Sequence, residues 1–240
     1  MKNAYTETEK IVFVLTGISL IFWLYYLSFI SWNPQILYLF LWLIFGGIPM
    51  YYLRGRIAAR ANSLSKKLSV RFFVVSYTTV LFEEIFAAFV NNLHEGFTPL
   101  LFSERILQFW AFNIFAFSGI FVAWFLLRQY FLYSNKEVFY LSGIFGIYVE
   151  LLSKGIGDVF SILLLATPMM FVYGLIVAPM SWITMPGEKM ISSKMARYTL
   201  PLLFIFICSL PFIFTLNTLR CAHPSFFPPS TLIPNKACNF

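Results

Sequence analysis

The sequence predicts an all-α protein, a polytopic integral membrane helical bundle, on three observations. The chain has 240 residues, of which 60% are hydrophobic and 20% aromatic, while only 11% are charged. Soluble domains carry about 25% charged residues, so this composition excludes an ordinary soluble globule. Apolar runs recur that are long enough to cross a bilayer, which takes about 20 residues of helix. Lys and Arg, finally, gather in alternate connections between these runs.

We expect about seven transmembrane helices in a single transmembrane domain that covers residues 1–240. The fifth is the shortest and carries Glu150, so it is either a tilted helix supported by its neighbours or a re-entrant segment. A tight turn over residues 31–34 predicts that the first two spans form an antiparallel hairpin. Pro168 and Pro179 predict kinks in the sixth span, because each proline removes a backbone hydrogen bond. The expected spans cover residues 11–30, 35–53, 72–92, 106–127, 138–152, 159–184 and 198–219.

The positive charges predict the orientation of the bundle. Numbering the spans alternately divides the 17 Lys and Arg residues into thirteen on one side and four on the other. Short loops rich in Lys and Arg stay in the cytoplasm, so we expect a cytoplasmic N-terminus, an extracytoplasmic C-terminus and a multi-pass protein of the cell membrane. The net charge of +7 then indicates membrane lipids of the cytoplasmic leaflet as partners, and no nucleic acid. The first apolar run is too long for a cleaved signal peptide and is expected to remain as an anchor.

A proline-rich tail, residues 220–240, is expected on the outer side. Disulfides persist outside the cytoplasm, so Cys221 and Cys238 are predicted to be bridged; the alternative is two free thiols on the tail. Cys208 lies inside the last span and is expected to be a small buried apolar residue. His223 would sit just above the membrane, either as an interfacial polar residue or as part of a substrate site.

Two adjacent acids, Glu83 and Glu84, interrupt the apolar run of residues 72–90. An ionisable group at the centre of a membrane helix costs roughly 2.5 kcal/mol or more, and such groups usually face a protein interior or a wet cavity. The pair therefore predicts a functional site, in which a carboxyl acts as general base, general acid or proton carrier. The alternative is a protonated glutamate that makes a structural hydrogen bond between helices.

The acids of two spans should lie at the same depth. Glu84 is thirteen residues past Arg71, and Glu150 is thirteen residues past Glu137, which places each about 20 Å along its helix. Asn113 in the fourth span reaches a similar level. The sequence therefore predicts a layer of polar groups in the outer half of the membrane.

Helical periodicity indicates which faces carry these groups. Gly143 and Gly146 share a face with Glu150, and small residues allow a neighbouring helix to approach closely. Asn91 lies seven residues beyond Glu84 and shares its face, whereas Glu83 points about 100° away. We expect one glutamate to face a cavity and the other to bond a neighbouring helix. Candidate substrate-binding residues on or above this layer are Asn91, Asn113, Asp158 and His223.

Residues 82–85, Phe-Glu-Glu-Ile, resemble the double-glutamate motif of two families of intramembrane peptidases. In the CAAX-protease and bacteriocin-processing family an arginine follows four positions after the second glutamate, where this chain has Ala88, and two membrane histidines are needed that these spans lack. Residues 143–150 are similar in character to a later motif of the PrsW-like family, shifted by one position. Residues 155–158, Gly-Ile-Gly-Asp, match the GxGD signature of membrane aspartyl proteases, which need two aspartates, but Asp158 is the only aspartate in the chain.

These observations favour a membrane-embedded hydrolase with Glu83, Glu84 and Glu150 as catalytic residues. Glu84 would activate a water, Glu150 would assist or donate a proton, and Asn113 would orient the substrate or stabilise an oxyanion. One alternative is a proton-coupled transporter or ion pathway, which the kinks in the sixth span favour. Another is a non-catalytic subunit or scaffold whose acids bind a partner membrane subunit. The sequence has no P-loop, zinc-type spacing or serine-nucleophile elbow, so it assigns no metal and leaves the cofactor open.

Overall fold

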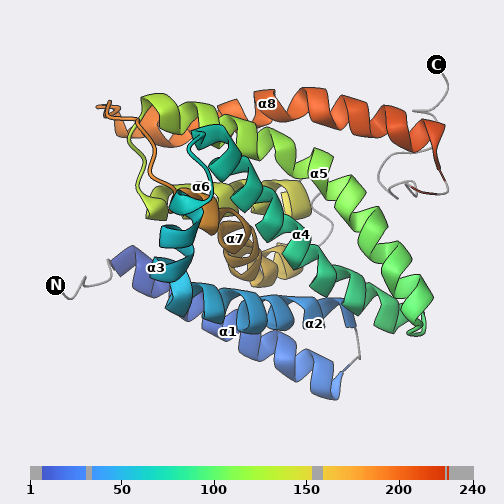
Figure 1. Cartoon of the computed structure of the whole chain (residues 1–240). Coiled ribbons are helices and arrows are strands. Elements are labelled where there is room, and N and C mark those ends of the chain that lie inside the picture. The colour runs from blue at the N-terminus through green and yellow to red at the C-terminus, as the bar shows by residue number, and fades with distance from the viewer. Residues whose placement is uncertain (1–6, 31–33, 153–158, 225, 227–240) are drawn as a thin grey trace.

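The computed structural model describes residues 7–30, 34–152, 159–224 and 226, and these residues form a helical bundle (Figure 1). The described part of the chain contains no β-strand beyond one isolated bridge between Phe131 and Lys189. In chain order the elements are α1 (Glu7–Phe29), α2 (Pro34–Leu41), the π-helical segment η1 (Trp42–Gly47), α3 (Ile48–Ser63), α4 (Leu68–Glu95), α5 (Pro99–Tyr130), α6 (Asn135–Ile147), the π-helical segment η2 (Tyr148–Leu152), α7 (Val159–Ser181) and α8 (Lys194–Ala222).

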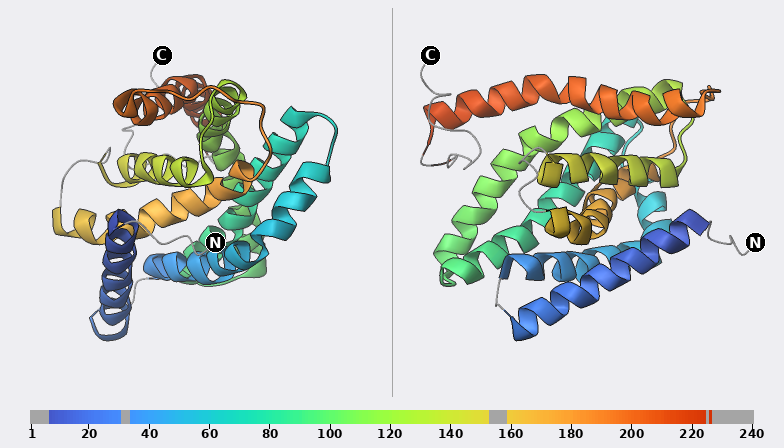
Figure 2. Two further views of the ribbon diagram at one scale, coloured as in Figure 1. Left: turned by 90° about the vertical axis from the view of Figure 1, so that its left-hand side faces the viewer. Right: turned by 180° about the vertical axis from the view of Figure 1, so that it is seen from behind.

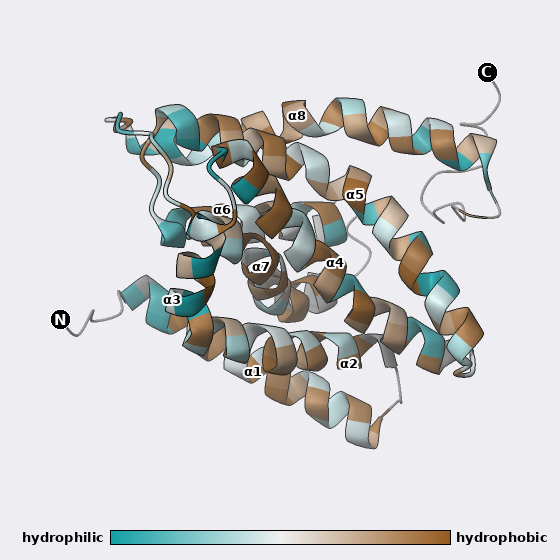
Figure 3. Cartoon of the chain, viewed as in Figure 1, coloured by the Kyte–Doolittle hydropathy of each residue, from teal (hydrophilic) through white to brown (hydrophobic). Residues whose placement is uncertain are grey.

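The structure confirms the all-helical membrane class. Within the described residues, six helices are long and apolar enough to cross a bilayer: Glu9–Phe29, Ile36–Ser63, Leu68–Leu93, Pro99–Tyr130, Leu164–Ser181 and Lys194–Ala222. Large apolar side chains are exposed on the outer helices, including Ile21 and Phe214 at 71% and 69%. Hydrophobic residues fill the middle of the helices and hydrophilic ones gather toward their ends (Figure 3). This surface suits lipid rather than water.

The predicted fifth span is a continuous helical rod made of α6 and η2. Its 18 residues carry three charged side chains, Lys136, Glu137 and Glu150, which keeps it outside the set of six apolar spans. Both glycines on its buried face, Gly143 and Gly146, lie against α7. The rod is therefore a short helix that packs closely on its neighbour α7.

Two contacts show which helix ends lie together at one end of the bundle. Lys136 at the start of α6 forms an ion pair of 2.6 Å with Glu9 near the start of α1. Asn62 at the end of α3 donates a hydrogen bond of 3.3 Å to the carbonyl of Trp182, just after α7. We call this the basic end; the far end carries the α4–α5 connection and the end of α8 (Figure 1). The helices thus alternate in direction, as the charge pattern predicts.

Prolines inside α7 and α8 each leave a backbone carbonyl without its usual helical hydrogen bond, and a side chain from another part of the bundle donates to that carbonyl. Pro168 cannot donate to the carbonyl of Leu164, and the hydroxyl of Ser19 in α1 donates to that carbonyl instead. Pro201 likewise frees the carbonyl of Arg197, which accepts a hydrogen bond of 3.4 Å from the hydroxyl of Tyr133. The carbonyls freed by these prolines therefore hold separate parts of the bundle together.

An ion pair joins α6 to α8 at the basic end. Ser134 caps α6, and Glu137 completes the capping box by accepting hydrogen bonds from the Ser134 backbone. The Arg197 guanidinium donates to both oxygens of Glu137, with 2.8 Å from its NH2 to Oε2. This pairing lowers the pKa of Glu137 from its ordinary 4.5 to about 2.

We predict a consequence for stability in acid. Because the pKa of Glu137 is lower in the folded state, its contribution is complete above pH 4.5 and is lost as the pH falls toward 2. The thermal midpoint of the wild type should therefore fall more steeply across this window than that of Glu137→Gln. Equal slopes in scanning calorimetry of the two detergent-purified proteins would contradict the assignment.

Candidate functional site

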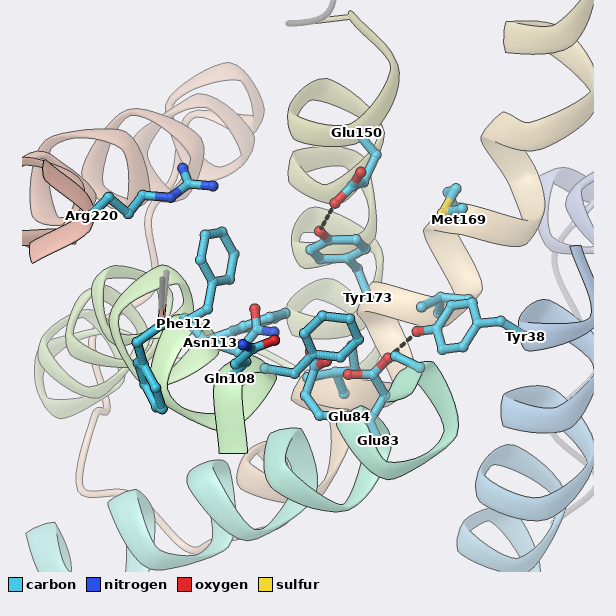
Figure 4. A pocket seen from close by; sticks show the side chains of 16 residues that line it. Tyr38, Glu83, Glu84, Gln108, Phe112, Asn113, Glu150, Met169, Tyr173 and Arg220 are labelled. Carbon is cyan, nitrogen blue, oxygen red and sulfur yellow. Dashed lines mark hydrogen bonds between the residues drawn. The ribbon is translucent and has the colours of Figure 1, made fainter. Parts of the chain in front are cut away.

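A cavity of about 400 Å³ lies between α2, α4, α5, η2, α7 and the end of α8, toward the far end of the bundle. Figure 4 shows side chains from these separate helices directed toward one space. The walls combine carboxyl, hydroxyl, amide and aromatic groups, with one guanidinium near the end of α8. The lining residues are Tyr38, Glu83, Glu84, Ala87, Gln108, Phe109, Phe112, Asn113, Phe117, Glu150, Met169, Val172, Tyr173, Ile176, Arg220 and Phe226.

The adjacent acids of α4 both lie on the wall of this cavity and are buried, with 3% of Glu83 and 6% of Glu84 exposed. The hydroxyl of Tyr38 in α2 donates a hydrogen bond to Oε1 of Glu83. Oε2 of Glu83 is buried and has no hydrogen-bond partner among the described residues. The carboxyl groups of Glu83 and Glu84 are neighbours on this wall and interact electrostatically. Two neighbouring buried carboxylates repel each other, so we expect one of the two to carry a proton.

Glu150 reaches the same cavity from the π-helical segment η2. The hydroxyl of Tyr173 in α7 donates a hydrogen bond of 2.7 Å to Oε1 of Glu150 (Figure 4). Glu150 also interacts electrostatically with both Glu83 and Glu84. π-Helical turns are rare and occur often at functional sites, because the wider turn redirects side chains. The predicted meeting of acids from two spans at one depth thus corresponds to one shared cavity.

Two glycines of α6 allow the contact that positions Glu150. A Cβ atom on Gly143 would lie 2.5 Å from the carbonyl oxygen of Met170, and one on Gly146 would lie 2.2 Å from Cγ of Tyr173. No other residue type fits this approach of α6 to α7 without a shift. The ring of Tyr173 therefore packs directly on Gly146, one helical turn below the carboxylate that it contacts.

We predict that Gly146→Leu lowers the stability of the protein by about 1–3 kcal/mol, because the added side chain must displace the Tyr173 ring. Unfolding of the purified protein in a denaturing detergent mixture measures this change. Gly17→Leu is a matched control, since a Cβ on Gly17 meets no atom within 4 Å. Equal stability of the two variants would show that the α6–α7 approach is unimportant.

Helix α5 supplies the amides of the cavity, Asn113 and Gln108. Arg105, one turn before, donates a hydrogen bond of 2.8 Å to Oε1 of Gln108 and so holds that amide in place. Arg220 lies over the ring of Phe112, with 5.1 Å between its guanidinium carbon and the ring centroid. The amide N–H groups are neutral donors, and they could stabilise an oxygen that gains negative charge.

Within the described residues, no group of three or more His, Cys, Asp or Glu side chains is arranged to hold a metal ion. The acids of the cavity are instead held by tyrosine hydroxyls. This arrangement suits proton transfer and polar binding.

Other candidates from the sequence lie elsewhere. Asn91 is half-buried on α4 and does not line the cavity. His223 caps the end of α8, is exposed, and also lies outside the lining. Asp158 lies outside the described residues. Cys221 is disulfide-bonded and Cys208 is free, while Cys238, the predicted partner of Cys221, lies outside the described residues.

Sequence reasoning missed four polar residues of the cavity: Tyr38, Gln108, Tyr173 and Arg220. Arg220 could have been found from the sequence, because it is an isolated basic residue at the outer end of the last span. Sequence reasoning also expected one acid to face the cavity and the other to bond a neighbouring helix. Glu83 does both, because the Tyr38 hydroxyl comes from the cavity wall itself.

Comparisons of the chain with protein-family models, with curated proteins and with solved structures found no match. The resemblance of residues 82–85 to intramembrane peptidases is therefore confined to that short motif. The geometry of the cavity is the basis for assigning a function.

Proposed function

We propose that this protein is a membrane-embedded hydrolase in which the Glu83–Glu84 pair supplies the general base and Glu150 the general acid. The observation that carries the proposal is the burial of these two adjacent carboxyl groups on the wall of one cavity, with Glu150 on another wall. A pair that holds one proton keeps one carboxylate as a base, as in the aspartic proteases. No metal is needed for such a step.

The roles follow from the contacts of each group. Glu83 accepts from Tyr38 and is fixed in position, so Glu84 is the better candidate to take a proton from an attacking water. The water oxygen would bond to the carbonyl carbon of the substrate, the bond to the leaving group would break, and an acid would protonate that group. Glu150 on another wall is a candidate for this acid, and Asn113 is a candidate donor to the oxyanion.

The substrate class that fits is a peptide or lipid with a carbonyl group at membrane depth. Aromatic rings line much of the cavity, including Phe109, Phe112 and Phe117, and they provide an apolar surface for such a molecule. The positive-inside rule orients the basic end toward the cytoplasm of a cell membrane, and the cavity then lies nearer the outer face.

Incorporation of heavy oxygen tests hydrolysis while the substrate is still unidentified. The purified protein is reconstituted with total lipids and membrane peptides of its host and incubated in H₂¹⁸O. Hydrolysis adds one ¹⁸O to each new carboxylate, and mass spectrometry identifies the labelled products. We expect labelled products with the wild type and none with Glu84→Gln. Label that is equal in both samples, or absent from both, would exclude the hydrolase.

A second candidate function, proton-coupled exchange of an organic cation, is favoured by the charge of the cavity. Its described lining holds three carboxyl groups and one guanidinium beside several aromatic faces, which attract cations. In vesicles, a pH gradient should then drive uptake of tetraphenylphosphonium, with Glu84→Gln abolishing the uptake. Uptake without ¹⁸O incorporation would select this function over hydrolysis.

A further inference from the structure

A second cavity, of about 590 Å³, lies between α3, α4 and α7 and shares no lining residue with the acid cavity. Its lining is apolar except for two arginines of α3 and two threonines of α4. Figure 2, in its left view, shows α3 and the start of α4 together at an edge of the bundle. Leu64 and Phe82 of its lining are exposed, so the groove faces the surroundings of the protein rather than its core.

The apolar part of the groove is close in length to the hydrocarbon of one leaflet. Along α4 it extends from Val74 to Phe82, which is eight residue steps or about 12 Å of helix. One leaflet contributes about 15 Å of hydrocarbon. Apolar side chains on its wall remain partly exposed, with Leu53 at 42% and Val74 at 45%. A hydrocarbon chain lying there would cover them.

Arg56 and Arg60 lie one helical turn apart in α3, in the half of the groove nearer the basic end. Both side chains are exposed, and neither pairs with a carboxylate of the described residues. Guanidinium groups bind phosphate oxygens through charge-assisted hydrogen bonds. Two such groups above an apolar groove complement a molecule with an anionic phosphate head and an acyl chain.

We propose that this groove binds one anionic diacyl phospholipid from the leaflet at the basic end. Its phosphate lies on Arg56 and Arg60, and one acyl chain runs along α3 and α4 past Thr78 toward Phe82. The site requires both the anionic head and the acyl chain of the lipid. It therefore discriminates against zwitterionic lipids, which have no net negative charge, and against free phosphates, which have no acyl chain. Basic pockets between helices on the cytoplasmic side of membranes bind anionic head groups in the same way.

Native mass spectrometry of the full chain in neutral detergent tests the site, with dioleoylphosphatidylglycerol, dioleoylphosphatidylcholine and glycerol phosphate as probes. We expect one retained phosphatidylglycerol and no retention of the other two. Arg56→Gln/Arg60→Gln should weaken phosphatidylglycerol binding by about 10- to 30-fold. Lys66→Gln/Lys67→Gln removes the same charge from exposed residues outside the groove and should leave binding unchanged.

A second variant separates the acyl groove from the charge. Thr78→Trp fills the apolar half at an exposed position and should abolish retention while the arginines remain. Binding that survives either Thr78→Trp or the double arginine change overturns the proposal. Retention of glycerol phosphate, equal retention of phosphatidylcholine, or a dimer of the chain in place of bound lipid also overturns it.

Discussion

Replacing Glu84 by Gln is expected to lower the rate of ¹⁸O incorporation by about 10²- to 10⁴-fold, the usual contribution of a general base. Glutamine has nearly the shape of glutamate but cannot accept the proton of an attacking water. The fold should survive, because the amide remains a polar group of the same size on the cavity wall. Rates are measured with the reconstituted protein, and circular dichroism and the thermal midpoint report the fold.

Two further variants sharpen this expectation. Glu104→Gln is the matched control, since that side chain is exposed on α5 and lies outside the cavity lining. Groups that act as a unit give non-additive losses, so Glu83→Gln/Glu84→Gln should cost about as much as Glu84→Gln alone. A double variant whose loss is the product of the two single losses would show that Glu83 and Glu84 act independently.

Arg128→Met is expected to cause the largest loss of stability, about 3 kcal/mol or more. The Arg128 side chain is buried, with 6% exposed, and its guanidinium donates to three carbonyls just at and after the end of α7. These hydrogen bonds run to Met180, Ser181 and Ile183, at 3.0, 2.9 and 3.2 Å. A helix leaves its last carbonyls without partners, and a cation there is favourable. Methionine would leave these carbonyls buried and without a donor.

Equilibrium unfolding in a denaturing detergent series measures this effect. Arg128→Lys should recover only part of the loss, because an ammonium cannot reach three carbonyls in a planar fork. Lys194→Met, at an exposed position of the same end, is the control and should stay within about 0.5 kcal/mol of the wild type. A midpoint for Arg128→Met equal to that of Lys194→Met would mean that the cap does not stabilise α7.

Much of the fold could be predicted because helix geometry and lipid constrain it strongly. A rise of 1.5 Å per residue places Glu84 and Glu150 at one depth, and they line one cavity. The glycines at 143 and 146 indicate the face of close approach, and this face does meet α7. These predictions need only positions along and around single helices.

The remainder depends on packing between helices. Asn91 shares a helical face with Glu84 but lies about 10 Å further along the axis, beyond the cavity. Tyr38 and Tyr173 are ordinary aromatic residues in the sequence, and only the arrangement of α2, α4, η2 and α7 makes them partners of the acids. From the charge pattern alone, Arg128 is one of several basic residues in a loop on the cytoplasmic side. In the structure its side chain is buried and caps the end of a helix.

The proton that we expect on the Glu83–Glu84 pair can be tested directly, without a substrate, by reaction with dicyclohexylcarbodiimide at neutral pH. This apolar reagent modifies protonated carboxyl groups and not carboxylates. Digestion and mass spectrometry should locate one adduct on the peptide that contains Glu83 and Glu84, and none on Glu104, which is exposed. An unmodified pair, or a pair modified no more than Glu104, would contradict a proton-sharing acid site in this cavity.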